Sequence, residues 1–176
     1  MKSIAVIFIL FSMLVEAQNV EKIIPADYGY IVKIGQQAPD FQTTTSDGKT
    51  IQLSELKGKV VMLQFTASWC SVCRKEMPHI ETDIWQKHKG NSDFALFGID
   101  LDEPAKKVKD FATQIPVSYP MLLDPKGKIF YSYAEKGAGV TRNVIIDKTG
   151  KIVYMTRLYK EEEFEEMKIV IDNLLK

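Results

Sequence analysis

Residues 60–66 constrain the fold more than any other segment of the chain. They read Val-Val-Met-Leu-Gln-Phe-Thr, and such a nearly continuous apolar run is typical of a strand buried on both faces of a central sheet. Residues 94–99 form a second run of this kind. Between the two runs, Met77, Ile80 and Ile84 recur at helical spacing. A buried strand, an amphipathic helix and another buried strand in this order predict an α/β fold with helices on the faces of its sheet.

The helix between these strands should begin at or just after Cys70. Pro78 lies inside it and is expected to kink it without ending it, because the helical periodicity resumes beyond the proline. Residues 104–114 predict another helix, with proline in its first turn. Residues 124–127, Asp-Pro-Lys-Gly, place proline and glycine where a type I turn favours them.

Short strands precede and follow this unit. Residues 41–45 and 50–53 bracket an Asp-Gly turn, which predicts a β-hairpin. Residues 141–146 and 151–156 are joined by a connection so short that the two strands are expected to be antiparallel. The chain closes with a helix whose shared apolar face consists of Phe164, Met167, Ile171 and Leu174. The order of elements, a hairpin followed by βαβα and then ββα, predicts one domain with a mixed central sheet.

The first seventeen residues have the features of a secretory signal peptide. Lys2 supplies positive charge, residues 4–15 form an apolar run too short to span a bilayer, and Val15 and Ala17 place small residues before a cleavage site. An uncleaved membrane anchor is the alternative, and the absence of a nearby cysteine excludes a lipoprotein anchor. We therefore expect an exported, periplasmic protein. Its parts would be a signal peptide at 1–17, an extension without assigned function at 18–33 and a folded domain at 34–176.

The charge of the chain is balanced, with 23 Lys and Arg residues against 23 Asp and Glu residues. A nucleic acid or an anionic membrane surface would be recognised by an excess of positive charge. The composition therefore gives no support for a partner of either kind.

Both cysteines lie in one motif, residues 69–78, which reads WCSVCRKEMP. A structural disulfide between Cys70 and Cys73 would close a loop of only a few residues, and so short a loop restricts the unfolded chain little. A zinc site needs more ligands than two thiolates, and His79 and His88 do not form a second paired motif. We therefore predict a redox pair, with no metal and no cofactor.

The junction of a buried strand and a helix gives the two cysteines different expected roles. Cys70 should lie at the helix N-terminus, where unpaired N–H groups and the helix dipole favour a thiolate, and should be the exposed attacking thiol. Cys73, one turn further on, should be shielded and resolve the mixed disulfide. Trp69 is a candidate for the substrate-docking surface. Arg74 and Lys75 either add positive potential or are simply solvated.

Glu76 is the candidate proton carrier. It lies three positions after Cys73 on the same side of the helix. A partly buried carboxylate there would have a raised pKa and could exchange a proton with Cys73. An exposed helical glutamate is the alternative. Gln64, on the preceding strand, points at the same region but cannot titrate.

The chain resembles the TlpA/ResA branch of thioredoxin-like proteins, exported thiol–disulfide oxidoreductases with a domain similar to the AhpC/TSA redoxins. The resemblance rests on Ala-Pro-Asp-Phe, Gly-Lys-Val-Val, Trp-Cys-x-x-Cys and Glu-Met-Pro together, and it extends from about residue 34 to the C-terminal helix. It implies a thioredoxin-like fold with an N-terminal hairpin extension. It also implies an attacking role for Cys70, a resolving role for Cys73, an active-site acid at Glu76 and a helix-kinking proline at Pro78. Gln64 stands where cytoplasmic thioredoxins carry a buried aspartate.

Thr141 departs from this family, which usually places a cis-proline there, opposite the cysteines. A cis bond before threonine would cost about 3–4 kcal/mol, so the Val140–Thr141 bond is expected to be trans. Thr141 would then offer a hydroxyl and a backbone N–H close to Cys70. Val140 and Thr141 are expected to dock the substrate together with Trp69.

We therefore expect a thiol–disulfide oxidoreductase, and more specifically a monomeric reductase of protein disulfides. It would receive electrons from a membrane or periplasmic thiol donor, although the motif does not fix the direction of exchange. The alternative from another class is a redox-sensing or metal-carrying thiol-binding module without turnover. A thiol peroxidase is less well supported. Peroxiredoxins frame their reactive cysteine with Pro-x-x-x-Thr-x-x-Cys, and Leu63 and Ala67 stand at the corresponding positions here.

Overall fold

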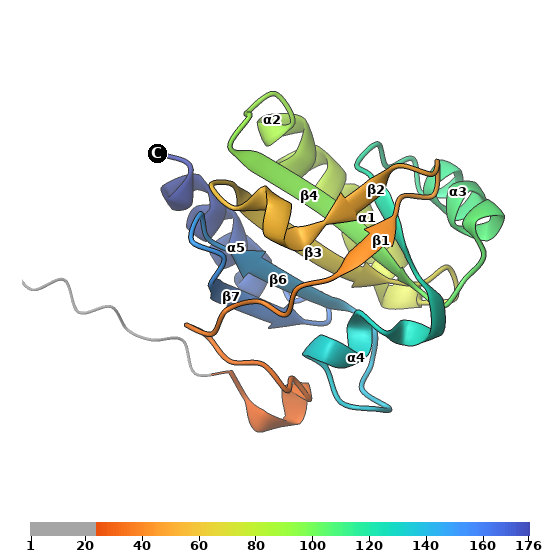
Figure 1. Cartoon of the computed structure of the whole chain (residues 1–176), viewed down its shortest axis with the longest axis horizontal. Coiled ribbons are helices and arrows are strands. Elements are labelled where there is room, and N and C mark those ends of the chain that lie inside the picture. Colours follow the sequence, from red (N-terminus) through yellow and green to blue (C-terminus); the bar gives the residue numbers. More distant parts are fainter. Residues whose placement is uncertain (1–23) are drawn as a thin grey trace, which may run out of the picture.

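A five-stranded mixed sheet forms the centre of the computed structural model, which describes residues 24–176 (Figure 1). The predicted signal peptide and the first residues of the predicted extension lie outside the described residues. The strand order is β5-β4-β3-β6-β7. Strands β3, β4 and β5 are parallel, β6 pairs antiparallel with β3, and β7 pairs antiparallel with β6. The strands are β3 (Val60–Thr66), β4 (Phe94–Leu101), β5 (Met121–Asp124), β6 (Arg142–Ile146) and β7 (Ile152–Arg157).

The central strand β3 is buried along its whole length, as its apolar run predicts. Its register with β4 runs from Val60 opposite Phe94 to Thr66 opposite Asp100. The C-terminal ends of the two strands therefore lie side by side. The chain leaves β3 at this edge of the sheet and enters the first helix there.

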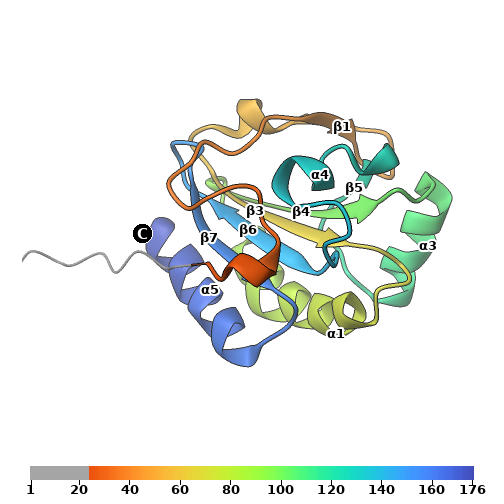
Figure 2. The ribbon, with the colours of Figure 1, turned by 90° about the horizontal axis from the view of Figure 1, so that it is seen from below.

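Helices α1, α3 and α5 cover one face of the sheet, and α4 and the N-terminal hairpin cover the other (Figure 2). The apolar faces predicted for the first and last helices are buried, through Met77, Ile80 and Ile84 in one and Phe164, Met167 and Ile171 in the other. The helices are α1 (Ser71–His79), α2 (Gln86–His88), α3 (Ala105–Gln114), α4 (Phe130–Tyr133) and α5 (Glu161–Leu174). The mixed sheet with helices on its faces is the predicted fold class.

The helix that starts at the cysteines continues beyond Pro78, but it changes its winding there. Helix α1 ends at His79, and a π-helix, η3 (Ile80–Trp85), leads directly into α2. Proline has no N–H to donate to the preceding turn. The N–H of Ile80, two residues after the proline, is shared between the carbonyl oxygens of Glu76 and Met77. A π-helical segment is a recognised cause of helix bending, so the expected irregularity at Pro78 takes this form.

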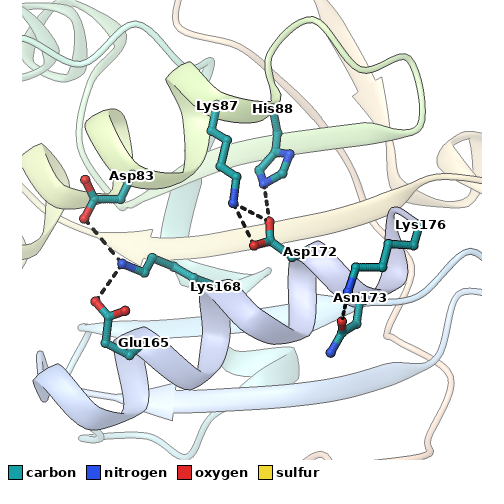
Figure 3. A network of polar contacts seen from close by, with 8 residues as sticks. All are labelled: Asp83, Lys87, His88, Glu165, Lys168, Asp172, Asn173 and Lys176. Atoms are coloured by element: carbon teal, nitrogen blue, oxygen red, sulfur yellow. Dashed lines mark hydrogen bonds and ion pairs between the residues drawn. The ribbon is translucent and has the colours of Figure 1, made fainter.

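Polar contacts tie this long helix to α5 (Figure 3). Lys87 Nζ lies 2.7 Å from Asp172 Oδ2, and His88 Nε2 lies 3.0 Å from Asp172 Oδ1. Lys168 Nζ lies 2.6 Å from Glu165 Oε1 and 3.8 Å from Asp83 Oδ2. Such partly exposed ion pairs contribute little individually, so the buried apolar face of α5 dominates its attachment to the sheet.

The predicted hairpin forms a separate two-stranded sheet of β1 (Gln42–Thr44) and β2 (Thr50–Gln52). Thr45 bridges Leu122 of β5, and the Ser46 N–H donates to the Met121 carbonyl oxygen at 2.7 Å. The hairpin thus forms hydrogen bonds with part of the free edge of β5. Without the hairpin, the backbone groups of this edge would be open to pairing with another chain.

Two short elements were missed, and one predicted turn is wrong. Strand β5 and helix α4 were not predicted from the sequence. Both are four residues long, and β5 acquires its extended form from pairing with β4. The turn after β5 is not of type I, because Lys126 is left-handed, with φ 65° and ψ 16°.

The described part of the N-terminal extension packs on the domain. It includes a short 3₁₀-helix, η1 (Ala26–Tyr28). The Ile31 N–H donates to the Tyr133 carbonyl oxygen at 2.9 Å, and the Tyr30 hydroxyl donates to the Thr156 carbonyl oxygen at 2.6 Å. No helix in residues 24–176 has the length and apolar character required to cross a membrane.

Candidate active site

Cys70 and Cys73 lie where β3 meets α1, as predicted. Cys70 is the N-cap residue of α1, and its Sγ accepts a hydrogen bond of 3.2 Å from the Cys73 N–H. The two residues form a disulfide, with their Cα atoms 5.3 Å apart. In the reduced protein the same N–H group and the helix dipole favour a thiolate at Cys70.

The two sulfurs differ in exposure, but less than expected. Cys70 is 7% exposed and Cys73 is 0% exposed. Cys70 is therefore the more accessible sulfur, although it is largely buried and not openly exposed as the sequence suggested. The surface of Cys70 that a substrate disulfide could reach is therefore small.

Thr141 lies directly beside the disulfide. Its Oγ1 is 3.1 Å from Cys70 Sγ and 3.3 Å from Cys73 Sγ. Disulfide sulfurs carry no hydrogen, so the hydroxyl is the donor in this oxidised state. The Val140–Thr141 peptide bond is trans, as predicted. The expected contact from the Thr141 N–H is not formed, since in the described part of the chain that group donates to neither sulfur.

Glu76 is fully buried, at 1% exposure, where partial burial was expected. Burial raises the pKa of Glu76 to about 8, and the nearby amides of Asn143 and Gln64 oppose that rise. Asn143 Nδ2 donates to Oε1 of Glu76 at 2.6 Å, while Oε2 has no hydrogen-bond partner among residues 24–176. The carboxyl group is therefore mostly protonated at neutral pH. Within that range, no hydrogen bond joins Glu76 to either cysteine.

A buried polar cluster surrounds this acid, and most of its members were not predicted. Asn143 also donates to Thr156 Oγ1 at 2.9 Å, and the Tyr119 hydroxyl donates to Gln64 Oε1 at 2.7 Å. Gln64 and Asn143 are register partners on β3 and β6. The sequence carried a signal for Gln64, which interrupts an otherwise apolar strand, but not for Asn143, which follows Arg142 at the polar start of β6.

The rim of the site combines two exposed residues, Trp69 and Leu158, with the buried Val140. Trp69 is 64% exposed, which is compatible with its predicted role in docking, whereas Val140 is buried at 4% exposure. Leu158, which was not predicted, follows β7 with a left-handed backbone (φ 62°) and donates its N–H to the Thr141 carbonyl oxygen at 3.1 Å. This unusual conformation places an apolar side chain, 38% exposed, next to the residue that contacts the sulfurs.

The two basic residues after the motif differ from one another. Arg74 is not simply solvated: its Nε donates to the Ser68 carbonyl oxygen at 2.9 Å, and its guanidinium lies 5.0 Å from the centre of the Phe111 ring. Lys75 is exposed. Arg74 thus braces the loop that leads into Cys70, a role that the sequence did not indicate.

Among residues 24–176, no group of three or more His, Cys, Asp or Glu side chains is placed to bind a metal ion. The two histidines have other partners. His79 stacks on Tyr159 with ring centroids 5.2 Å apart, and His88 pairs with Asp172.

A disulfide of Cys-x-x-Cys spacing, at the start of a helix that follows the central strand of this mixed sheet, defines a thioredoxin-like thiol–disulfide oxidoreductase. Residues 33–171 match the model of the Redoxin family, and the chain belongs to that family. Over 123 residues it is 37% identical to the thiol-disulfide oxidoreductase ResA of Bacillus thuringiensis strain Al Hakam, covering 69% of this chain and 68% of the relative.

Solved structures agree with this assignment. A Bacteroides thetaiotaomicron protein, described as a candidate protein disulfide isomerase, is 62% identical with a TM-score of 0.81, covering 84% of this chain and 92% of that one. A Chlorobium tepidum protein, described as a candidate thiol:disulfide interchange protein DsbE, is 28% identical with a TM-score of 0.71, covering 82% of this chain and 99% of that one. The protein is thus an enzyme of the ResA/DsbE type, acting on protein thiols or disulfides.

Proposed function

We propose that this protein reduces disulfides in exported proteins, with Cys70 as the attacking and Cys73 as the resolving thiol. The observation that carries the proposal is the position of Cys70 Sγ. It lies at the N-terminus of α1 with the Cys73 N–H at 3.2 Å and the Thr141 hydroxyl at 3.1 Å. Both groups stabilise a thiolate, and the thiolate is the nucleophile in disulfide exchange.

The exchange then takes two balanced steps. The Cys70 thiolate attacks one sulfur of the substrate disulfide, forming a mixed disulfide and releasing the other substrate sulfur as a thiolate. Cys73 then attacks Cys70 Sγ, which restores the internal disulfide and releases the second substrate thiolate. Two electrons pass from the enzyme dithiol to the substrate.

Glu76, in the fraction of molecules in which it is ionised, would accept the proton that Cys73 loses before it attacks. The pKa of this buried acid, about 8, is close to that of an ordinary thiol, so proton transfer between the two groups costs little. Thr141 directly precedes β6 and Asn143 lies two residues further on, in that strand, so we expect their side chains to face the same side of the sheet. One contacts the sulfurs and the other contacts Glu76. A route along this face would replace the direct Glu76–Cys73 contact inferred from helix spacing.

Substrate docking is assigned to the rim of the site. Trp69 would supply exposed aromatic surface, Thr141 would face the incoming sulfur, and the buried Val140 would contribute through its backbone. The protein would be monomeric and periplasmic, released from or held by its N-terminal segment. An oxidising compartment would return Cys70 and Cys73 to the disulfide, so a membrane or periplasmic thiol donor would be needed to reduce them.

Insulin reduction with dithiothreitol as electron donor tests this function. The wild-type protein should accelerate the reaction, and Cys70→Ser should abolish the acceleration. Cys73→Ser should trap a mixed disulfide through Cys70, and Ser71→Ala should serve as the unaffected neighbour. The proposal would be refuted by a wild-type protein without turnover. It would also be refuted by a Cys70→Ser variant that traps a mixed disulfide through Cys73.

The reduction potential of the Cys70–Cys73 pair tests the direction of exchange. A value near the roughly −270 mV of thioredoxin supports a reductase, and one near the roughly −120 mV of DsbA would overturn that part of the proposal.

A further inference from the structure

A second pair of acidic residues, Asp100 and Glu103, lies beside the loop that leads into Cys70. Asp100, on β4, is fully buried, and its Cα pairs with that of Thr66 at the end of β3. Glu103 follows β4, and its side chain is 5% exposed. The proposed exchange mechanism uses neither carboxyl group.

Glu103 is bonded to the loop through Ser68. Its Oε2 accepts the Ser68 N–H at 2.6 Å, and its Oε1 accepts the Ser68 hydroxyl at 2.8 Å. On the other side, the Ser68 carbonyl oxygen accepts a hydrogen bond from Arg74. Ser68 lies two residues before Cys70, so these contacts fix the backbone that carries the nucleophile.

Asp100 is bonded differently from Glu103. Neither of its oxygens accepts a hydrogen bond in the described part of the chain. A buried carboxylate without donors is strongly disfavoured, whereas a neutral carboxyl group has an O–H to donate. The Glu103 carboxylate is the acceptor available to it, because Glu103 raises the pKa of Asp100 both by its charge and as a hydrogen-bond partner of the neutral acid.

The charges around the pair agree with a neutral Asp100 beside an ionised Glu103. The pKa of Asp100 is raised to about 8, chiefly by burial and also by Glu103 and Asp124, while Lys107 lowers it. Burial also raises the pKa of Glu103, but hydrogen bonds from Lys107 and Ser68 outweigh burial and leave it below its ordinary value.

We propose that Asp100 and Glu103 are positioning residues for the nucleophile. Neutral Asp100 donates a hydrogen bond to Glu103, and Glu103 in turn holds the N–H and hydroxyl groups of Ser68. The result is that Cys70 Sγ stays within reach of the Cys73 N–H and the Thr141 hydroxyl. This inference rests on the proposed attacking role of Cys70.

Alkylation of Cys70 by iodoacetamide in the reduced Cys73→Ser protein, followed against pH, tests the proposal. Asp100→Ala should raise the pKa of Cys70 and slow alkylation at pH 7 about tenfold, less than the roughly hundredfold that a 1 Å displacement can cost. Asp100→Asn keeps a donor that cannot ionise and should restore the wild-type rate within about twofold. Equal effects of the alanine and asparagine variants would overturn the role of the neutral acid.

Substitution of Glu103 gives an independent test, because its charge and its hydrogen bonds to Ser68 have opposite effects on the pKa of Cys70. Loss of its negative charge alone would lower the pKa of Cys70, whereas loss of its hold on Ser68 should raise it. Glu103→Ala should therefore raise the pKa of Cys70, and a lowered or unchanged pKa would refute the proposal. Asp110→Ala, which removes an exposed carboxylate of α3 paired with Lys106, is the matched control and should have no effect.

Carbon-13 NMR of the Asp100 carboxyl group provides a measurement on the unmutated protein, should Asp100→Ala fail to fold. Asp100 should be neutral at pH 7, and an ionised group would overturn the proposal. Alkylation and NMR need no protein substrate. Absence of insulin reduction would therefore refute the proposed function while leaving this inference standing.

Discussion

Asn143 Nδ2 donates a 2.6 Å hydrogen bond to Oε1 of Glu76 across the interface between β6 and α1. The two residues are 67 positions apart in the sequence, and both are buried. Asn143 favours the ionised form of Glu76 and burial favours the neutral form. Burial has the larger effect, so the acid titrates near neutral pH, and this balance has measurable consequences.

The first consequence is a loss of stability with rising pH. The pKa of Glu76 is raised from 4.5 to about 8 on folding. The folded protein therefore binds this proton more tightly, and the resulting stabilisation is complete below pH 4.5 and is lost as the pH rises through 8. Each unit of pKa difference corresponds to about 1.4 kcal/mol, so the free energy of unfolding should fall by a few kcal/mol.

Urea denaturation of the oxidised protein between about pH 5 and pH 8.5 measures this loss. Glu76→Gln should reduce the dependence of the free energy of unfolding on pH. Asp100→Asn should reduce this dependence further, because the pKa of Asp100 is also raised to about 8. Glu162→Gln, an exposed position on α5, should leave this dependence unchanged. A wild-type stability that is constant over this range would contradict the assignment of Glu76 as neutral.

The hydrogen bond itself can be tested through Asn143. Asn143→Val removes the donor while retaining a residue suited to a buried strand, so the pKa of Glu76 should rise further. A hydrogen bond to a charged group is worth about 1.5–3 kcal/mol, which sets the scale of the change. Carbon-13 NMR titration of the Glu76 carboxyl group measures it. An unchanged or lowered pKa would show that Asn143 does not stabilise the ionised form.

Local patterns were sufficient to predict the central strand, the hairpin and the helix start at Cys70. Each depends on residues within about ten positions of one another, such as the apolar run before Thr66 or the Asp-Gly turn between the hairpin strands. β5 differs, because its four residues have no pattern of their own. They become a strand through pairing with β4 and contact with the hairpin.

The residues of the candidate site also divide into those that local sequence predicts and those that only the tertiary fold brings together. Cys70, Cys73 and Glu76 share one motif, so their spacing on a helix was enough to bring them together. Asn143 and Tyr119 reach the site from distant strands and loops, and only the tertiary fold brings them to Glu76 and Gln64. Sequence spacing predicted the acid but could not show how deeply other elements bury it.

Trp69 is expected to affect substrate binding without affecting the chemistry of the sulfurs. It is 64% exposed, so Trp69→Ala should leave stability and the pKa of Cys70 unchanged. Loss of an aromatic contact worth about 1.4 kcal/mol would lower kcat/KM for insulin reduction about tenfold. Tyr131→Ala, which removes an exposed aromatic residue of α4, is the matched control. Equal activity of both variants would exclude Trp69 from docking.

Thr141 should influence both the acidity and the redox equilibrium of the cysteines. Its hydroxyl lies 3.1 Å from Cys70 Sγ, and a thiolate accepts a stronger hydrogen bond than a disulfide sulfur does. Thr141→Val retains the shape of the side chain but lacks the donor. The pKa of Cys70 should therefore rise, and the reduced form should be less stable, so the reduction potential should become more negative. For this two-electron couple, a loss of about 1.4 kcal/mol in the stability of the reduced form would lower the reduction potential by about 30 mV.

Thr141→Ser and Thr141→Pro complete this series. The serine variant keeps a hydroxyl and should restore values close to those of the wild type, whereas the proline variant lacks the donor and should shift both quantities. Thiolate absorbance against pH gives the pKa, and equilibration with glutathione gives the potential. If the valine and proline variants leave both values unchanged, the contact with Thr141 does not stabilise the thiolate, and the strong nucleophile at Cys70 must depend on the N-terminus of α1 alone.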